Sequence, residues 1–181
     1  MGARCLLRMA NPLVVRFSAR DRALMERCAI APSAPWSSRA WWTLITHFGG
    51  SGFTILASAL PWWACCEFHQ ASRLAILTLV GSHLIVQLLK RTIVRGRPAQ
   101  TCDLEATIRE PDRFSFPSGH ATASMAVALS YGAVFPAFVA PLLLLAILVG
   151  FSRIRLGVHY PSDVLAGQLI AGATAALTFS I

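Results

Sequence analysis

Three short polar stretches in an otherwise apolar sequence contain the residue types that could do chemistry. They read KRTIVRGRP over residues 90–98, RFSFPSGH over residues 113–120 and SRIRLGVHYPSD over residues 152–163. Every stretch supplies cations, which suit the oxygens of a phosphate group. The second and third stretches also supply a histidine each. Because an imidazole can act as an acid, a base or a nucleophile near neutral pH, the sequence predicts chemistry on a phosphate-like anion.

The first stretch places two cations at a spacing that a helix would align. Lys90 and Arg97 are seven residues apart, so they share a face if the preceding helix continues to Arg97. Gly96 and Pro98 would then end that helix. Arg97 would offer a planar fork to phosphate oxygens and Lys90 a point charge. A basic cluster that anchors a helix end in the headgroup region would use the same residues.

The second stretch has the features of a helix start that could bind an anion. Pro117, Ser118 and Gly119 precede a long helical run, which predicts Ser118 as the N-cap. Gly119 would let a ligand approach the backbone, where the N–H groups of a helix start attract negative charge. His120 could donate a proton to a departing oxygen there. An ordinary loop-to-helix transition is the alternative.

The third stretch contains a histidine and a carboxylate one helical turn apart. His159 is followed four residues later by Asp163, and Pro161 suits the first turn of the last expected helix. A carboxylate that holds one imidazole nitrogen presents the other nitrogen as a nucleophile or base. Such a pair is often only structural, but here it shares a stretch with Arg153. We therefore interpret it as functional.

The elements that must position these stretches are membrane spans. The chain has 181 residues, of which 55% are hydrophobic and 13% charged, and its mean hydropathy is +0.58. This composition argues against a disordered chain and against a nucleic-acid-binding one, despite a net charge of +8. We predict an all-α, multi-pass transmembrane bundle. Its five expected spans cover residues 41–63, 74–89, 121–135, 142–151 and 164–181.

Paired tryptophans delimit the first expected span. Trp41-Trp42 and Trp62-Trp63 are about 21 residues apart, or roughly 31 Å along a helix, which matches a hydrocarbon core with an aromatic belt at each face. Three glycines inside this span predict a close approach by a neighbouring helix. They are Gly49, Gly50 and Gly52.

The first 40 residues form a basic arm ahead of the membrane-embedded domain, which we expect over residues 41–181. Phe17, Leu24, Met25 and Cys28 recur at helical spacing and predict an amphipathic helix on the membrane surface. A helix packed on the domain is the alternative.

The number of spans also places the three polar stretches relative to the membrane. If five spans thread alternately, all three stretches lie on one face together with the basic arm. Because an excess of Lys and Arg marks the cytoplasmic side, we expect this face to be cytoplasmic.

No metal or cofactor site is expected from the sequence. The five cysteines lack zinc-binding spacing. The carboxylates of one polar loop offer no convergent set for magnesium: Asp103, Glu105, Glu110 and Asp112. His47 and His83 fall within expected spans, and we expect them to be hydrogen-bonded inside the bundle.

Together the three stretches resemble the type-2 phosphatidic acid phosphatase superfamily. Its pattern is Lys-x6-Arg-Pro, then Pro-Ser-Gly-His, then Ser-Arg-x5-His-x3-Asp. Every block is intact here, from Lys90 to Arg97-Pro98, at Pro117 to His120, and from Ser152-Arg153 through His159 to Asp163. The resemblance covers roughly residues 74–181, and the first 70 residues carry no motif of the family.

The resemblance implies a role for each matching position. His159 resembles the nucleophile that forms a phosphohistidine, and Asp163 the partner that orients it. His120 resembles the acid that protonates the leaving group and the base that then activates water. The remaining positions resemble the phosphate cradle: Lys90, Arg97, Ser118, the Gly119 backbone N–H and Arg153.

The implied activity is metal-independent hydrolysis of a lipid phosphate at the membrane surface. Phosphatidate, phosphatidylglycerol phosphate, and a polyprenyl phosphate or diphosphate are all compatible, because the motifs contact the phosphate and not the tail. The implied partners are this substrate and the membrane phospholipids, with no nucleic acid, and the oligomeric state stays open. Two alternatives remain, a vanadium-dependent haloperoxidase-like oxidoreductase and a non-catalytic phospholipid-binding protein of the same fold.

Overall fold

The predicted all-α class is confirmed by a computed structural model, which describes residues 12–31, 33–64, 66–101 and 113–181. Besides helices, the described part contains one isolated bridge between Gly96 and Phe114. The helices are α2 (Pro12–Cys28), α3 (Trp36–His47), α4 (Ser51–Ala59), η1 (Leu60–Trp63), α5 (Cys66–Thr92), α6 (Pro98–Thr101), α7 (Gly119–Val134), η2 (Pro136–Phe138), α8 (Val139–Arg155) and α9 (Pro161–Phe179).

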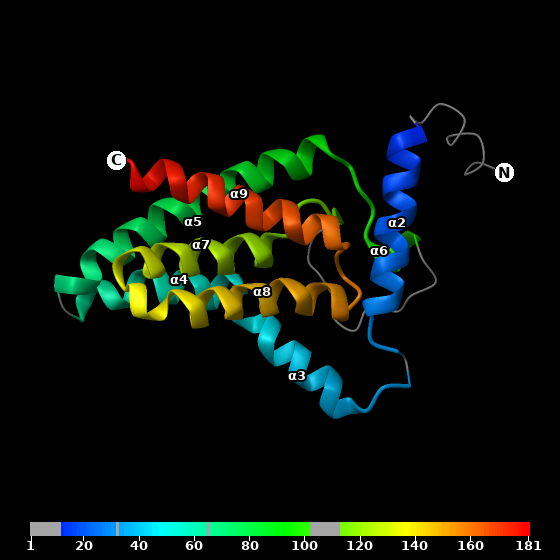
Figure 1. Cartoon of the computed structure of the whole chain (residues 1–181), viewed down its shortest axis with the longest axis horizontal. Coiled ribbons are helices and arrows are strands. Elements are labelled where there is room, and N and C mark those ends of the chain that lie inside the picture. The colour runs from blue at the N-terminus through cyan, green and yellow to red at the C-terminus, as the bar shows by residue number, and fades with distance from the viewer. Residues whose placement is uncertain (1–11, 32, 65, 102–112) are drawn as a thin grey trace.

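Helix α7 is the centre of the bundle and packs against α5, α8 and α9 (Figure 1). Its buried face consists of small residues, among them Ala121, Ser124, Ala128 and Gly132. Small side chains let helix backbones approach closely, which is how helices associate where lipid removes the hydrophobic driving force. The sequence of α7 therefore suits it to hold its three neighbours at short range.

Within the described part of the chain, three helices are long and apolar enough to cross a membrane. They are Cys66–Thr92, Pro136–Arg155 and Pro161–Phe179, where the second includes η2. Helix α7 has 16 residues, which is short for a bilayer about 30 Å thick. The spans predicted in these three places are present, whereas a total of about five is not confirmed.

The first predicted span is not one continuous helix. It breaks between α3 and α4, where Gly50 adopts an extended conformation with ψ near 150°. Gly49 lies against the start of α7 and against α8, because a Cβ atom there would be 2.8 Å from the His120 carbonyl oxygen and 2.5 Å from Val149 of α8. The predicted close approach is thus present at Gly49, but glycine also weakens a helix, and here the helix ends.

The chain after α5 also differs from the sequence prediction. Helix α5 ends at Thr92, so Lys90 and Arg97 do not share a helix face. The segment that follows pairs with the second polar stretch, where the Ser115 N–H donates to the Arg95 carbonyl oxygen at 2.8 Å. Arg97 therefore lies in the non-helical segment between α5 and α6.

Helix α2 crosses one end of the bundle (Figure 1). Met25 is fully buried in a cluster that includes Ile154 and Tyr160. These contacts match the alternative interpretation of a helix packed on the domain. Residues 1–11 of the basic arm lie outside the described residues, and the domain boundary at residue 40 stays a prediction.

The contact between α9 and the start of α7 can be tested with two glycines of α9. A Cβ atom at Gly167 would lie 2.6 Å from the Ser118 carbonyl oxygen and 2.7 Å from the Thr122 hydroxyl. Gly167→Ala should therefore lower the free energy of unfolding by about 1–3 kcal/mol. Gly172→Ala is the matched control, because no atom lies within 4 Å of its added Cβ. Thermal unfolding in detergent checks this, and equal stabilities would contradict the close packing.

Candidate active site

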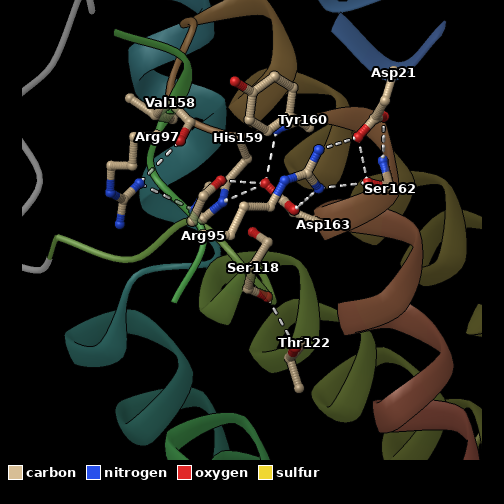
Figure 2. A network of polar contacts seen from close by, with 11 residues as sticks. Asp21, Arg95, Arg97, Ser118, Thr122, Val158, His159, Tyr160, Ser162 and Asp163 are labelled. Carbon is tan, nitrogen blue, oxygen red and sulfur yellow. Dashed lines mark hydrogen bonds and ion pairs between the residues drawn. The ribbon is translucent and has the colours of Figure 1, made fainter. Parts of the chain in front are cut away.

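The structure brings the three polar stretches together at the end of the bundle that α2 covers (Figure 2). A cavity of about 660 Å³ opens there and runs between α3, α4 and α5. Five of the eight predicted site residues line it: Lys90, Gly119, His120, Arg153 and His159. Of the other three, Arg97 and Asp163 lie beside His159, and the Ser118 N–H donates to the Asp163 carbonyl oxygen at 3.0 Å. The predicted residues thus occupy one site although they come from three separate parts of the chain.

His159 is buried, with 1% of its surface exposed, between a carboxylate and a guanidinium. Its Nδ1 atom lies 3.6 Å from Asp163 Oδ2, slightly beyond hydrogen-bond length. Its Nε2 atom lies 3.4 Å from Arg97 Nη1. Because a guanidinium can only donate, this contact favours the tautomer with the proton on Nδ1 and the lone pair on Nε2. That tautomer is the one a nucleophile needs.

The surroundings of His159 keep its imidazole neutral. Burial lowers the pKa of His159 from its ordinary value of 6.5 to about 4, because the charged form loses its hydration. The contact with Asp163 raises this pKa, and the charges of Arg153 and Arg97 lower it. The lone pair is therefore available throughout the neutral range.

This pKa predicts how His159 titrates. The unfolded chain binds the proton near pH 6.5 and the folded chain only near pH 4, so the site contributes stability above pH 6.5 that is lost as the pH falls toward 4. In a ¹H–¹³C spectrum, the His159 Cε1–H signal should move near pH 4. This signal is assigned to His159 because it should be absent from the spectrum of the His159→Asn variant. A midpoint near 6.5 would contradict the buried, neutral imidazole.

Asp163 is completely buried in the first turn of α9 and is held on several sides. Its Oδ2 atom accepts from the Tyr160 N–H at 2.9 Å and from the Ser115 hydroxyl. Its Oδ1 atom lies 2.6 Å from Arg95 Nη1. Residues of all three polar stretches therefore fix the position of the Asp163 carboxylate.

Two arginines are fixed in the wall of the site. Arg153 is fully buried, and its Nη1 atom donates to the Thr46 hydroxyl of α3 at 2.7 Å. Arg97 is 6% exposed and donates from Nη1 to the Val158 carbonyl oxygen at 3.0 Å. Lys90 adds a third buried cation at the end of α5. This concentration of positive charge suits the oxygens of a phosphate.

The start of α7 supplies the rest of the site. Ser118 is at the N-cap position, as predicted, but its hydroxyl does not cap the helix. That hydroxyl is buried without a hydrogen-bond partner in the described part of the chain. An added Cβ at Gly119 would meet no atom within 4 Å, so the backbone there is open to a ligand. The predicted anion site therefore has a donor and space available.

Some residues of the site were missed by sequence reasoning. Arg95 and Ser115 belong to the polar stretches but match no block of the motif, so only their positions could have indicated a role. Thr46 lies in an apolar segment that gives no such indication.

His47 and His83 differ from expectation. Both are exposed side chains that line the cavity, and His83 Nε2 lies 3.1 Å from Gln87 Nε2. They belong to the wall of the cavity and not to the interior of the bundle.

Among the described residues, no group of three or more His, Cys, Asp or Glu side chains could hold a metal ion. The loop carboxylates Asp103, Glu105, Glu110 and Asp112 lie outside the described residues.

The sequence profile of the PAP2 superfamily matches residues 71–181. The chain belongs to the PAP2 superfamily.

The relatives of this PAP2 protein act on several lipids. A lipid A 1-phosphatase of Rhizobium etli is 33% identical over 140 residues, which cover 75% of this chain and 60% of the relative. A decaprenylphosphoryl-5-phosphoribose phosphatase of Mycolicibacterium smegmatis is 37% identical over 134 residues, which cover 68% of this chain and 67% of the relative. The chain thus spans about three fifths of the length of the lipid A phosphatase that it matches.

A solved structure has the same fold over nearly the whole chain. It is the PAP2-type phosphatidylglycerolphosphate phosphatase of Bacillus subtilis, with a TM-score of 0.77 and 25% sequence identity. The match covers 96% of this chain and 88% of the other. Because the match extends well before residue 71, it includes part of the N-terminal region as well as the motif-bearing helices. The chain is therefore an integral membrane protein with helical spans.

Proposed function

We propose that this PAP2 protein removes phosphate from a membrane lipid through a phosphohistidine at His159. The observation that carries the proposal is the neutral imidazole of His159, buried between Asp163 and Arg97, beside a cavity with cationic walls. A site that only bound phosphate would not need a nucleophile, which argues against the non-catalytic alternative. The apolar spans argue against the haloperoxidase alternative.

In the first step, His159 Nε2 attacks phosphorus and the bond from phosphorus to the leaving oxygen breaks. His120 protonates that oxygen, and Asp163 stabilises the positive charge that develops on the imidazole. Negative charge on the three equatorial oxygens is stabilised by the cations and donors of the cradle. They are Lys90, Arg97, Arg153, the Ser118 hydroxyl and the Gly119 N–H.

In the second step, His120 takes a proton from water as the water oxygen attacks the phosphohistidine. The phosphorus–nitrogen bond breaks, its electrons return to His159, and phosphate leaves. His120 thus regains the proton that it gave to the leaving group, and the enzyme returns to its starting state. His120 borders the cavity at the start of α7, where it can reach either the leaving group or water.

The substrate is a lipid because the cavity continues from the cations into the membrane-spanning part. The apolar part of its lining includes Ile55, Leu79, Val80 and Leu84, of which Ile55, Val80 and Leu84 are exposed. A phosphate at the cationic end and a hydrocarbon tail against these side chains would occupy both parts. Phosphatidate, phosphatidylglycerol phosphate, polyprenyl phosphates and lipid A all have this form.

A substrate panel tests the proposal. Purified protein in detergent should release phosphate from at least one of these lipids, and excess EDTA should leave the rate unchanged because no metal takes part. His159→Ala should release none. A failure to release phosphate from every lipid, or a loss of activity with EDTA that magnesium restores, would refute the proposed function.

We propose further that the site faces the cytoplasm, as the basic arm indicates. The C-terminus lies at the opposite end of the bundle from α2 (Figure 1). A reporter fused after Ile181 should therefore read as non-cytoplasmic. A cytoplasmic signal would reverse the orientation.

A further inference from the structure

We infer that Asp21, on α2, is a positioning residue that acts on Asp163 through Arg95. Asp21 is 5% exposed, and its Oδ2 atom lies 2.6 Å from Arg95 Nη2. Its Oδ1 atom accepts from the Ser162 N–H at 3.0 Å, and its Oδ2 atom also contacts the Ser162 hydroxyl. A buried carboxylate with this many partners is fixed in place.

Arg95 links this carboxylate to the candidate active site. Its Nη1 atom lies 2.6 Å from Asp163 Oδ1 and donates to the Ser162 hydroxyl at 2.8 Å. Its guanidinium lies 4.0 Å from the centre of the Tyr160 ring. Figure 2 shows Arg95 between Asp21 and Asp163. One guanidinium is therefore shared by two carboxylates, of which only Asp163 faces His159.

Sharing the guanidinium has a consequence for catalysis. If Arg95 paired with Asp163 alone, its charge would cancel the negative charge that Asp163 presents to His159. Because the Asp21 carboxylate partly neutralises the Arg95 guanidinium, Asp163 can still stabilise the His159 imidazole as the ring becomes positive during attack. Asp21 also fixes the place of Arg95 and thereby of the Asp163 carboxylate. Asp21 lies before residues 71–181, so this contribution comes from outside the segment that matches the family.

The test compares two carboxylate substitutions on α2. The inference rests on the proposed function, so both are assayed on a lipid that wild type hydrolyses and His159→Ala does not. Asp21→Asn should lower kcat about tenfold with KM within twofold of wild type, because a displaced catalytic group costs rate more than binding. Glu26→Gln is the control, because Glu26 pairs with Arg22 at 2.8 Å on the exposed face of the same helix. It should leave both constants unchanged.

A double-mutant cycle separates positioning from general stability. Arg95→Gln alone should lower kcat, and Asp21→Asn added to it should cause a much smaller loss than in the wild-type background, because the contact through Arg95 is already gone. Equal kcat in wild type and Asp21→Asn, or losses that multiply in the double variant, would overturn the inference while His159→Ala still supports the proposed function. An inactive wild type would refute the proposed function instead.

We also propose that His83 and Gln87 bind a second polar group of the lipid, between its scissile phosphate and its hydrocarbon tail. His83, Gln87 and Lys90 follow one another at helical spacing on α5, and all three line the cavity. Gln87 lies about 5 Å and His83 about 10 Å along the helix axis from Lys90. Polar side chains are costly where they face lipid tails, so this stretch of wall suits a polar ligand.

The chemistry expected of that group is a set of acceptor oxygens, either a second phosphate or hydroxyls. This proposal also rests on the proposed function, because it places the scissile phosphate beside Lys90. Lipids that carry such a group should be better substrates than lipids that join phosphate almost directly to the hydrocarbon. His47, from α3, also lines this cavity.

Two matched pairs of substrates test this proposal and distinguish the sources of the oxygens. Phosphatidylglycerol phosphate is compared with phosphatidate, which has the same tails, and a polyprenyl diphosphate with its monophosphate. In at least one pair, wild type should have a higher kcat/KM for the lipid with the extra polar group, which is phosphatidylglycerol phosphate or the diphosphate. The double variant His83→Leu with Gln87→Leu should lower this ratio of kcat/KM values about tenfold. Its kcat/KM for phosphatidate or the monophosphate should stay within twofold of wild type. His69→Leu is the control, since His69 stacks on Trp62 near the other end of α5. Equal kcat/KM values for both lipids of each pair in wild type, or equal losses of kcat/KM on both lipids in the double variant, would overturn this proposal. Activity on any of the four lipids would still support the proposed function.

Discussion

Replacing His159 with alanine should reduce phosphate release by roughly 10⁴-fold or more, because the attacking atom is gone and water must replace it without activation. The cations around it stay in place. Arg97 still donates to the Val158 carbonyl oxygen and Arg153 to Thr46. Binding of the lipid should therefore change much less than kcat. Steady-state release from detergent-solubilised lipid measures both constants.

The control for this substitution is His69→Ala, since the His69 ring stacks on Trp62 with 5.0 Å between ring centres, away from the site. Thermal unfolding of both variants should show that each is folded, which removes loss of structure as an explanation. Activity of His159→Ala within tenfold of wild type would mean that another group attacks phosphorus.

Replacing His120 with alanine should lower kcat on alkyl lipid phosphates by about 10²–10⁴-fold, the usual contribution of a general acid or base. The effect should depend on the leaving group. An aryl phosphate releases a stable phenolate and needs no proton, so its first turnover should remain fast. Hydrolysis of the phosphohistidine should still be slow, because the base is also missing. The variant should therefore show a burst of phenol that equals the amount of enzyme, followed by a slow phase.

Rapid mixing with an aryl phosphate measures the burst, and wild type and His159→Ala are the controls. Wild type should continue without a marked slow phase, and His159→Ala should show neither phase. A slow first turnover in His120→Ala would mean that His120 does not act as the acid. A fast steady state would mean that it does not act as the base.

Local spacing made some of the site predictable. The contact of His159 with Asp163 spans four residues, and the place of Ser118 at the N-cap depends only on the residues next to it. One turn of regular backbone fixes such relations, so the sequence is enough to predict them. The gathering of the three stretches was predicted from five alternating spans; the stretches do meet, but that number of spans is not confirmed.

Long-range contacts could not be predicted in this way. Arg153 is held by Thr46 of α3, and Arg95 joins Asp21 to Asp163. Each of these pairs is far apart in the sequence, and neither the type of Thr46 nor that of Asp21 indicates by itself which residue it contacts. Their roles depend on how α2 and α3 pack against the end of the bundle.

The positions of the long helices were predictable from the sequence, but two of the helix ends were not. Long apolar runs predicted α5, α8 and α9 in their observed places. The end of α5 at Thr92 was missed because nothing before Gly96 forces a helix to stop. Pairing of the next residues with the second stretch ends it instead. The break after His47 was missed because its glycines indicated close packing equally well.

Trapping the phosphorylated enzyme tests the central claim most directly. His120→Ala is mixed with an aryl phosphate that carries ³²P and is quenched in alkali, where phosphohistidine survives. The label should stay with the protein, and mass spectrometry of its peptides should place the phosphate on His159. The double variant that also carries His159→Ala should retain no label. An unlabelled His120→Ala protein that still turns over, or a phosphate on any other residue, would contradict a phosphohistidine at His159.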